Sequence, residues 1–421
     1  MNEHSASVNG ISIYSLTNPN LRSFCLSLYV RAGSIFEDLS NNGISHLFEH
    51  VVFRNIKNKY ENFYELLAMH GLCFQGSTYK KFVSFTIDGP QHEFDFAIEI
   101  LCGLFDEIKL TSHDFNNEKG RIKAEIREKD RRSSLDFYFD SIVWKNSEVE
   151  KIVLGYCKTI DRVSVKKINE FRQKVLSAGN CFVYATGNIS DENLDALNKK
   201  ISELDISQSN PGFTNTVTVN NEFFHREKKI WIKNNYWHYI QIGFDVDCSK
   251  YPGGVYDLLY ALLFNGDKAL VYNYLSEDNP IIYSYDSTFE QYDNVGNINF
   301  SFEVDRNKIE DVFKTVVELL NAAKDGRFNF EANLNYEMFN WELDLDNPDN
   351  LNWNMAYYNH ILKTQPIDYS DEFYGRFRVT KEQIIDAAKY IFRRCNMTVA
   401  VKGDRKKINA EAIEKILESL D

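Results

Sequence analysis

The chain has 421 residues, of which 43% are hydrophobic and 14% aromatic, a length and composition that suit two folded domains and exclude disorder. Its formal net charge of −13 disfavours phosphate-rich partners, so nucleic acid is excluded as an expected ligand. The seven cysteines are scattered and form no CxxC pair, so we expect no disulfide framework. The sequence has no signal-peptide pattern and no apolar run near the ~18 residues of a membrane span. These features predict a cytoplasmic protein.

The first half of the chain alternates strand and helix patterns. In chain order the predicted elements are strands Ile11–Leu16 and Phe24–Arg31, helices Ile44–Asn55 and Asn62–His70, strand Phe82–Ile87, helices Glu93–Ile108, Ser112–Arg132 and Val165–Leu176, and strand Cys181–Thr186. The last strand runs directly into Gly187.

The second half repeats this order of elements. The predicted elements are strands Ile230–Lys233 and Tyr239–Asp245, helix Tyr256–Phe264, strand Asn297–Val304, helices Ile309–Lys324 and Thr380–Phe392, and strand Met397–Lys402. A repeat of half the chain indicates a domain duplication, although any protein that mixes helices and strands offers a similar series. The polar stretch Ser207–Asn221, which contains Pro211 and Gly212, is the predicted linker between domains 1–208 and 222–421.

The segment GISHLFEHVVFRN carries the strongest chemical pattern in the chain. His46 and His50 are four residues apart, so a helix places both imidazoles on one face, where they can hold one zinc ion. Glu49 lies close to that face and can reach a water in the open coordination position as a general base. Apolar neighbours indicate that the segment is buried, which favours a metal site over satisfied core histidines or a solvated charged face.

A catalytic zinc needs a third protein ligand, and the charged helix EKGRIKAEIREKD offers one. Glu125 is the expected ligand, and Glu118, two turns earlier on the same face, is expected to orient a histidine or the bound water. A structural zinc module is disfavoured because such sites use four protein ligands, often cysteines, and only three are visible.

The HxxEH motif with Glu125, 75 residues after His50, resembles the M16 (pitrilysin and insulinase-like) family of zinc metallopeptidases. The resemblance covers the whole chain. It implies an α+β fold of two homologous domains, each a mixed and mostly antiparallel sheet with helices on one face, which close like a clamshell around a peptide. In the second half Asp257, Tyr260 and Ala261 stand where the motif would be, so one zinc per chain is expected.

The family also holds its peptide substrate along an edge strand, and the stretch from Gly71 to Thr78 is similar to that strand. Here Gln75 and Gly76 replace the family's Asn and Ala, and Thr78 is kept. Strand addition depends on the backbone, so Gln75, Gly76 and Thr78 are the expected substrate-binding residues.

Active family members carry an Arg and a Tyr seven residues apart in the second half, where they would hold the developing oxyanion. The matching stretch LSEDNPIIY has Tyr283, but Ser276 stands in place of the Arg, and Tyr283 can equally be read as an ordinary strand aromatic. The chain therefore resembles the zinc subunit of a two-subunit peptidase whose partner supplies the Arg/Tyr pair. Its size and composition resemble AlbF-type subunits that mature bacteriocin peptides, including sactipeptides.

The resemblance implies a zinc endopeptidase that hydrolyses peptides or leader and precursor segments. Glu49 would take the proton of the water and pass it to the leaving amine. The alternative is a non-catalytic M16-like scaffold or partner subunit of a peptide-processing complex.

Overall fold

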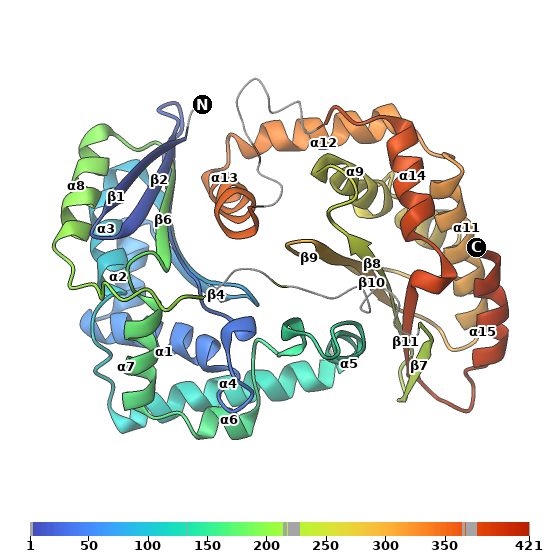
Figure 1. The fold of residues 1–421 in the computed structure, drawn as a ribbon, viewed down its shortest axis with the longest axis horizontal. Helices are drawn as coiled ribbons and strands as arrows, with labels where there is room; N and C mark the ends of the chain where they lie inside the picture. Colours follow the sequence, from blue (N-terminus) through green and yellow to red (C-terminus); the bar gives the residue numbers. More distant parts are fainter. Residues whose placement is uncertain are drawn as a thin grey trace. The chain divides into compact units, whose positions relative to one another are not determined.

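The computed structural model describes residues 3–132, 134–213, 228–363 and 377–420, together with Val217 and Ile367. The chain divides into two compact units (Figure 1). The first comprises Met1–Arg131, Asn146–Asn215 and Leu343–Ser370, and the second comprises Arg132–Lys145, Thr216–Glu342 and Asp371–Asp421. Within the described residues, no helix is both long and apolar enough to cross a membrane.

A six-stranded mixed sheet is the centre of the first unit. Its spatial order is β1-β2-β6-β3-β5-β4, and its neighbouring strands are antiparallel except for β2 and β6, which are parallel. The strands are β1 His4–Val8, β2 Ile11–Thr17, β3 Ser23–Val30, β4 Cys73–Thr78, β5 Val83–Pro90 and β6 Cys181–Gly187. Strand β4 forms one edge of this sheet.

Helices cover the sheet of the first unit on both faces. The helices of this unit are α1 Ile44–Lys59, α2 Phe63–His70, α3 Phe94–Gly103, α4 Ser112–Arg132, α6 Cys157–Asp161, α7 Val165–Val175, α8 Asp191–Ser202 and α13 Pro348–Met355. Leu26 and Leu28 of β3 join Leu47, Phe48 and Val51 of α1 in one apolar core. Alternation along β3 places these leucines on a single face, so this core fixes α1 against the sheet.

Helix α13 covers the opposite face, although it comes from late in the sequence. Its buried Asn352 accepts a hydrogen bond from the Tyr29 hydroxyl at 2.8 Å and donates to the carbonyls of Tyr184 at 3.0 Å and Cys25 at 3.3 Å. The middle strands β3 and β6 are therefore buried on both faces, which explains their long apolar runs.

The second unit contains a five-stranded sheet in the order β7-β11-β8-β10-β9. Its strands are β7 Ile230–Asn234, β8 Tyr239–Asp247, β9 Tyr285–Tyr292, β10 Val295–Glu303 and β11 Met397–Gly403. Its helices are α5 Ser134–Val143, α9 Gly253–Phe264, α10 Leu270–Tyr272, α11 Ile309–Lys324, α14 Lys381–Ile391 and α15 Ala410–Leu417, and α12 Phe330–Asp344 ends where the chain returns to the first unit. The only parallel pair among these strands is β7 with β11.

The predicted duplication is confirmed by the strand order. The series β2-β6-β3-β5-β4 and β7-β11-β8-β10-β9 have the same succession of one parallel and three antiparallel pairs. The division at 1–208 and 222–421 stays a prediction, and the second compact unit includes segment 132–145 while the first includes segment 343–370. Positions 214–216 and 218–221 of the predicted linker lie outside the described residues.

Candidate metal centre

The start of helix α1 is fixed by a buried carboxylate that sequence reasoning missed. The backbone N–H groups of Gly43 and Ser45 donate to Glu37 at 2.7 and 2.8 Å, and Asn42 donates at 2.8 Å. Gly43 has a φ of 95°, and a Cβ there would lie 2.8 Å from the carbonyl oxygen of Leu154. A glycine and a carboxylate acceptor thus begin the helix that carries the motif.

Helices α1 and α4 are held together by a row of charged side chains that interact between the two helices. Arg54 donates to Asp114 at 2.7 Å, and its Nε lies 3.7 Å from Glu118. Glu118 is only 2% exposed, and its carboxylate lies 3.6 Å from Nδ1 of His50. Glu125 follows two turns later on α4, so its side chain continues along the same side toward the histidines.

The structure brings His46, His50 and Glu125 together. Their potential ligand atoms all lie within 4.8 Å of one another. Oε2 of Glu125 lies 3.5 Å from Nε2 of His46 and 3.9 Å from Nε2 of His50. These separations are too long for hydrogen bonds, but ligands of a tetrahedral zinc with bonds of ~2.0–2.2 Å lie about 3.4 Å apart.

The chemistry of these donors fits a zinc ion. His46 is 6% exposed, and burial, with smaller effects of His50 and Lys129, lowers its pKa to about 3. Its Nδ1 is buried without a hydrogen-bond partner. A neutral imidazole is the form that ligates zinc, so a buried imidazole that is costly to charge is suited to a cation.

His50 has the opposite electrostatic environment. Burial alone would lower the pKa of His50, but Glu118, Glu49 and Glu125 around it outweigh this effect and raise the pKa above its usual value. Because Nδ1 of His50 faces Glu118, its Nε2 is the nitrogen directed toward Glu125. This is the orientation that a carboxylate beside a metal-binding histidine produces.

Glu49 lies between the two histidines in sequence and faces strand β4. Its Oε2 accepts a hydrogen bond from the Thr78 hydroxyl at 2.9 Å. Gly76 leaves room for this carboxylate, since a Cβ there would lie 2.9 Å from Oε1 of Glu49. Burial raises the pKa of Glu49 despite this hydrogen bond, so the side chain is a stronger base than an exposed glutamate.

The three predicted substrate-binding residues lie on the edge strand β4. Gln75 is exposed, whereas Gly76 and Thr78 are partly buried against α1. Among the described strands β4 pairs only with β5, so one of its backbone edges is open to a further strand. A pocket of about 360 Å³ lies beside this strand and is bordered by Glu49, His50 and Gly76.

A second group of potential ligands, Cys25, Asp88 and Asp349, also has its ligand atoms within 4.8 Å of one another. Burial, followed by the charge of Asp88, raises the pKa of the Cys25 thiol well above its usual value. The thiol therefore stays protonated at neutral pH, which makes this group a poor metal site.

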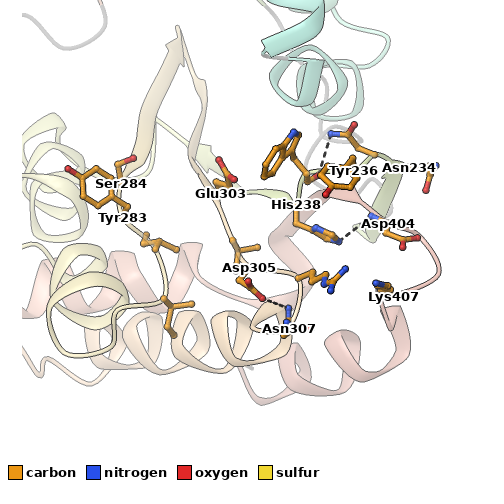
Figure 2. A pocket seen from close by; sticks show the side chains of 16 residues that line it. Asn234, Tyr236, His238, Tyr283, Ser284, Glu303, Asp305, Asn307, Asp404 and Lys407 are labelled. Carbon is orange, nitrogen blue, oxygen red and sulfur yellow. Dashed lines mark hydrogen bonds between the residues drawn. The ribbon is translucent and has the colours of Figure 1, made fainter.

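In the second unit, Tyr283 lies two residues before strand β9 and is 97% exposed. It therefore lies outside the strand, contrary to the reading of it as a strand aromatic. Figure 2 shows Tyr283 and Ser284 on one side of a pocket of about 900 Å³, with His238 and Asp404 on the other. Ser276, which stands at the expected Arg position, lies in the short π-helix Asn273–Glu277.

Comparisons with known proteins match both halves of the chain. The family model described as insulinase (peptidase family M16) matches residues 13–155, and the model described as peptidase M16 inactive domain matches residues 162–332. The zinc protease YmxG of Bacillus subtilis, described as uncharacterized, is 21% identical over 324 residues, which cover 75% of this chain and 77% of that protein.

Two further relatives show how far the likeness extends. The mitochondrial-processing peptidase subunit beta of Saccharomyces cerevisiae is 24% identical over 190 residues, which cover 44% of this chain and 41% of that subunit. A protease from Helicobacter pylori of known crystal structure has the same fold, with a TM-score of 0.83 at 18% identity over 96% of this chain and 99% of that one. With both of its halves matched, and with relatives that are zinc proteases, the chain belongs to peptidase family M16.

Proposed function

We propose that this chain is a zinc-dependent endopeptidase that hydrolyses peptides or precursor segments. The observation that supports this most strongly is the convergence of three donors, His46, His50 and Glu125, beside the buried carboxylate of Glu49. Two imidazoles, one carboxylate and an open position are the donor set of a catalytic zinc. The proposed stoichiometry is one zinc per chain.

The proposed role of Glu49 follows from its position. A zinc ion bound by the three ligands would lower the pKa of its water toward ~7 and polarise the peptide carbonyl. Glu49 takes the proton of the attacking water and later gives it to the leaving amine. Thr78 holds the carboxylate in place with its hydroxyl, and Glu118 fixes the ring of His50.

Strand β4 is proposed to bind the substrate backbone. An extended peptide that pairs with its open edge would run past Gln75 and Gly76, directly beside Glu49. Main-chain hydrogen bonds hold the peptide without regard to its sequence, so selectivity must come from side-chain pockets along the strand.

We further propose that full activity needs a second M16-like subunit. Tyr283 has no Arg seven residues before it, and loss of one oxyanion donor costs about 100- to 1000-fold in rate. A homodimer cannot supply the missing Arg, whereas a sister subunit can. One relative is named as a subunit of a peptidase, which supports this idea. Maturation of bacteriocin peptides in the cytoplasm is the setting proposed for such a pair.

Metal content and hydrolysis of single variants test the metal centre. We expect His46→Ala, His50→Ala and Glu125→Gln to lose most of the zinc, and Glu49→Gln to retain zinc but lose hydrolysis. Elemental analysis of purified proteins measures the first property, and cleavage of a quenched fluorescent peptide library measures the second. A His50→Ala protein that still carries one zinc would overturn the ligand assignment.

Activity assays with and without a partner test the two-subunit proposal. The chain alone is expected to be slow, and addition of an M16-like protein that has the Arg/Tyr pair but no HxxEH motif should raise the rate. If the chain alone already runs at the full rate, another residue of this chain must stabilise the oxyanion.

The second candidate function is a non-catalytic scaffold or partner subunit. Its support is that residues 162–332 match a model described as an inactive domain. This alternative predicts that the purified chain shows no hydrolysis with any partner, whether or not it binds zinc.

A further inference from the structure

The pocket beside Glu49 has a basic wall in a strongly acidic protein. Arg54, Lys57 and Arg121 border this pocket of about 360 Å³, while the chain as a whole has a formal net charge of −13. The carboxylates on the lining are Glu49 and Glu118. The lining of this pocket carries an excess of positive charge, although the net charge of the whole protein is negative. This local charge points to a ligand with negative charge.

The three basic residues are not equally available to a ligand. Arg54 is bound to Asp114 at 2.7 Å and lies near Glu118. Arg121 lies 3.4 Å from Glu118, but its side chain is 59% exposed. No described carboxylate lies within 4 Å of the Lys57 ammonium, which instead lies 4.5 Å from the centre of the Tyr64 ring. Lys57 is therefore the cation that has no counter-charge of its own.

Helix periodicity places Lys57 on the same stripe of α1 as the proposed catalytic base. Glu49, Phe53 and Lys57 follow at intervals of four residues, and all three border the pocket. Lys57 lies eight residues after Glu49, about 12 Å along the helix axis. Phe53 lies between them, so the pocket has an apolar middle and a cationic far end.

The aromatic ring of Tyr64 holds the ammonium at that far end. Tyr64 comes from helix α2 and is 54% exposed, and its face lies under the Lys57 ammonium. A cation–π contact of this kind is weak, so the ring orients Lys57 without neutralising it. The side chain stays available to a carboxylate that enters from the side of β4.

We propose that this pocket selects a glutamate side chain of the peptide, next to the scissile bond, and that Lys57 and Arg121 recognise its carboxylate. This inference rests on the proposed function, because strand β4 must hold the peptide beside Glu49. The apolar part of the pocket accommodates the methylene groups of the glutamate. Aspartate is shorter by one methylene and reaches the cationic end less well, so it is a poorer ligand.

A matched peptide series tests this selectivity. Peptides that differ only in Glu, Gln, Asp or Lys at the positions flanking one cleavage site are compared by kcat/KM. A partly exposed charge pair supports a preference of about 3- to 30-fold for Glu over Gln. Lys57→Gln should lower this ratio toward one, with the remainder due to Arg121, and Lys57→Glu should favour the Lys peptide. The preference should also shrink at high salt.

Lys59→Gln is the matched control on the same helix. The Lys59 ammonium is paired with Asp106 at 2.8 Å and does not border the pocket. This variant should keep the preference of the parent protein for Glu. If Lys57→Gln and Lys59→Gln change the ratio equally, the effect is general electrostatics and the proposal fails.

Binding to the Glu49→Gln protein separates this inference from the proposed function. Fluorescence anisotropy with labelled Glu and Gln peptides does not require hydrolysis. A Glu preference in binding that is weaker in Glu49→Gln/Lys57→Gln supports the pocket even if no peptide is ever cleaved, and the peptidase proposal then fails alone. Equal binding of the two peptides, or no binding of either, overturns the inference.

Discussion

Replacement of Glu118 by Gln is expected to weaken zinc binding without removing a ligand. The change keeps the shape of the side chain but removes the negative charge that faces Nδ1 of His50 at 3.6 Å. Glu118 is 2% exposed, so water cannot replace the lost carboxylate. The remaining contact of Arg54 with Asp114 at 2.7 Å should keep α1 and α4 together.

Partners of metal-binding histidines typically contribute 10- to 100-fold to metal affinity, which corresponds to about 1.4–2.7 kcal/mol. We expect Glu118→Gln to fall in this range and His50→Ala to lose much more. Competition with a chromophoric chelator measures the zinc affinity, and circular dichroism checks that the protein remains folded. Glu128→Gln, an exposed change on the same helix, is the control.

Two results would refute this reasoning. A Glu118→Gln protein with the zinc affinity of the parent would show that the carboxylate does not tune His50. An affinity as low as that of His50→Ala would instead indicate that Glu118 is itself a ligand.

Three further changes test the fold around the site. Asn352→Ala removes three buried hydrogen bonds between α13 and the first sheet, and urea unfolding should show a loss of about 2–4 kcal/mol; no loss would mean that α13 does not stabilise the unit. Glu37→Ala leaves the first N–H groups of α1 without their acceptor. This change should lower the unfolding free energy by about 1–3 kcal/mol and weaken zinc binding. If neither quantity changes, the role assigned to Glu37 is wrong. Burial, followed by Asp349, raises the pKa of Asp88 to about 6, so its contribution to stability is present below its unfolded pKa of ~3.9 and is lost as pH rises through 6. Asp88→Asn should therefore stabilise the protein by about 1–3 kcal/mol at pH 8 and have little effect at pH 4, as measured by thermal unfolding at both values, and an equal effect at both would contradict this.

Much of the fold was predictable because the two halves repeat one pattern. Alternation in β5 and β8 and the helical period of α11 are visible in single segments, and their matching order predicted the duplication. The edge strand β9 was missed, because its face is only partly buried and lacks a clear apolar alternation. Helix α13 was missed as well, because its role depends on the single polar residue Asn352, which carries no periodic signal.

Part of the candidate site was predictable from the sequence, and part was visible only in the structure. His46, Glu49 and His50 share one face of one helix, so the helical period alone predicted that they act together. Glu125 was predicted as the third ligand from its place on the charged helix, and its closeness to the histidines became measurable only when α4 was seen to lie beside α1.

The sequence by itself determined three features: the metal-binding face of α1, the duplicated order of elements and the membership in a family. What only the tertiary structure decided are the contacts between segments far apart in the chain. Glu37 at the start of α1, Thr78 on Glu49 and the basic pocket at Lys57 belong to this group. The reason is physical, because a helix or strand fixes neighbours only a few residues away, whereas burial in a common core selects which distant polar side chains must meet.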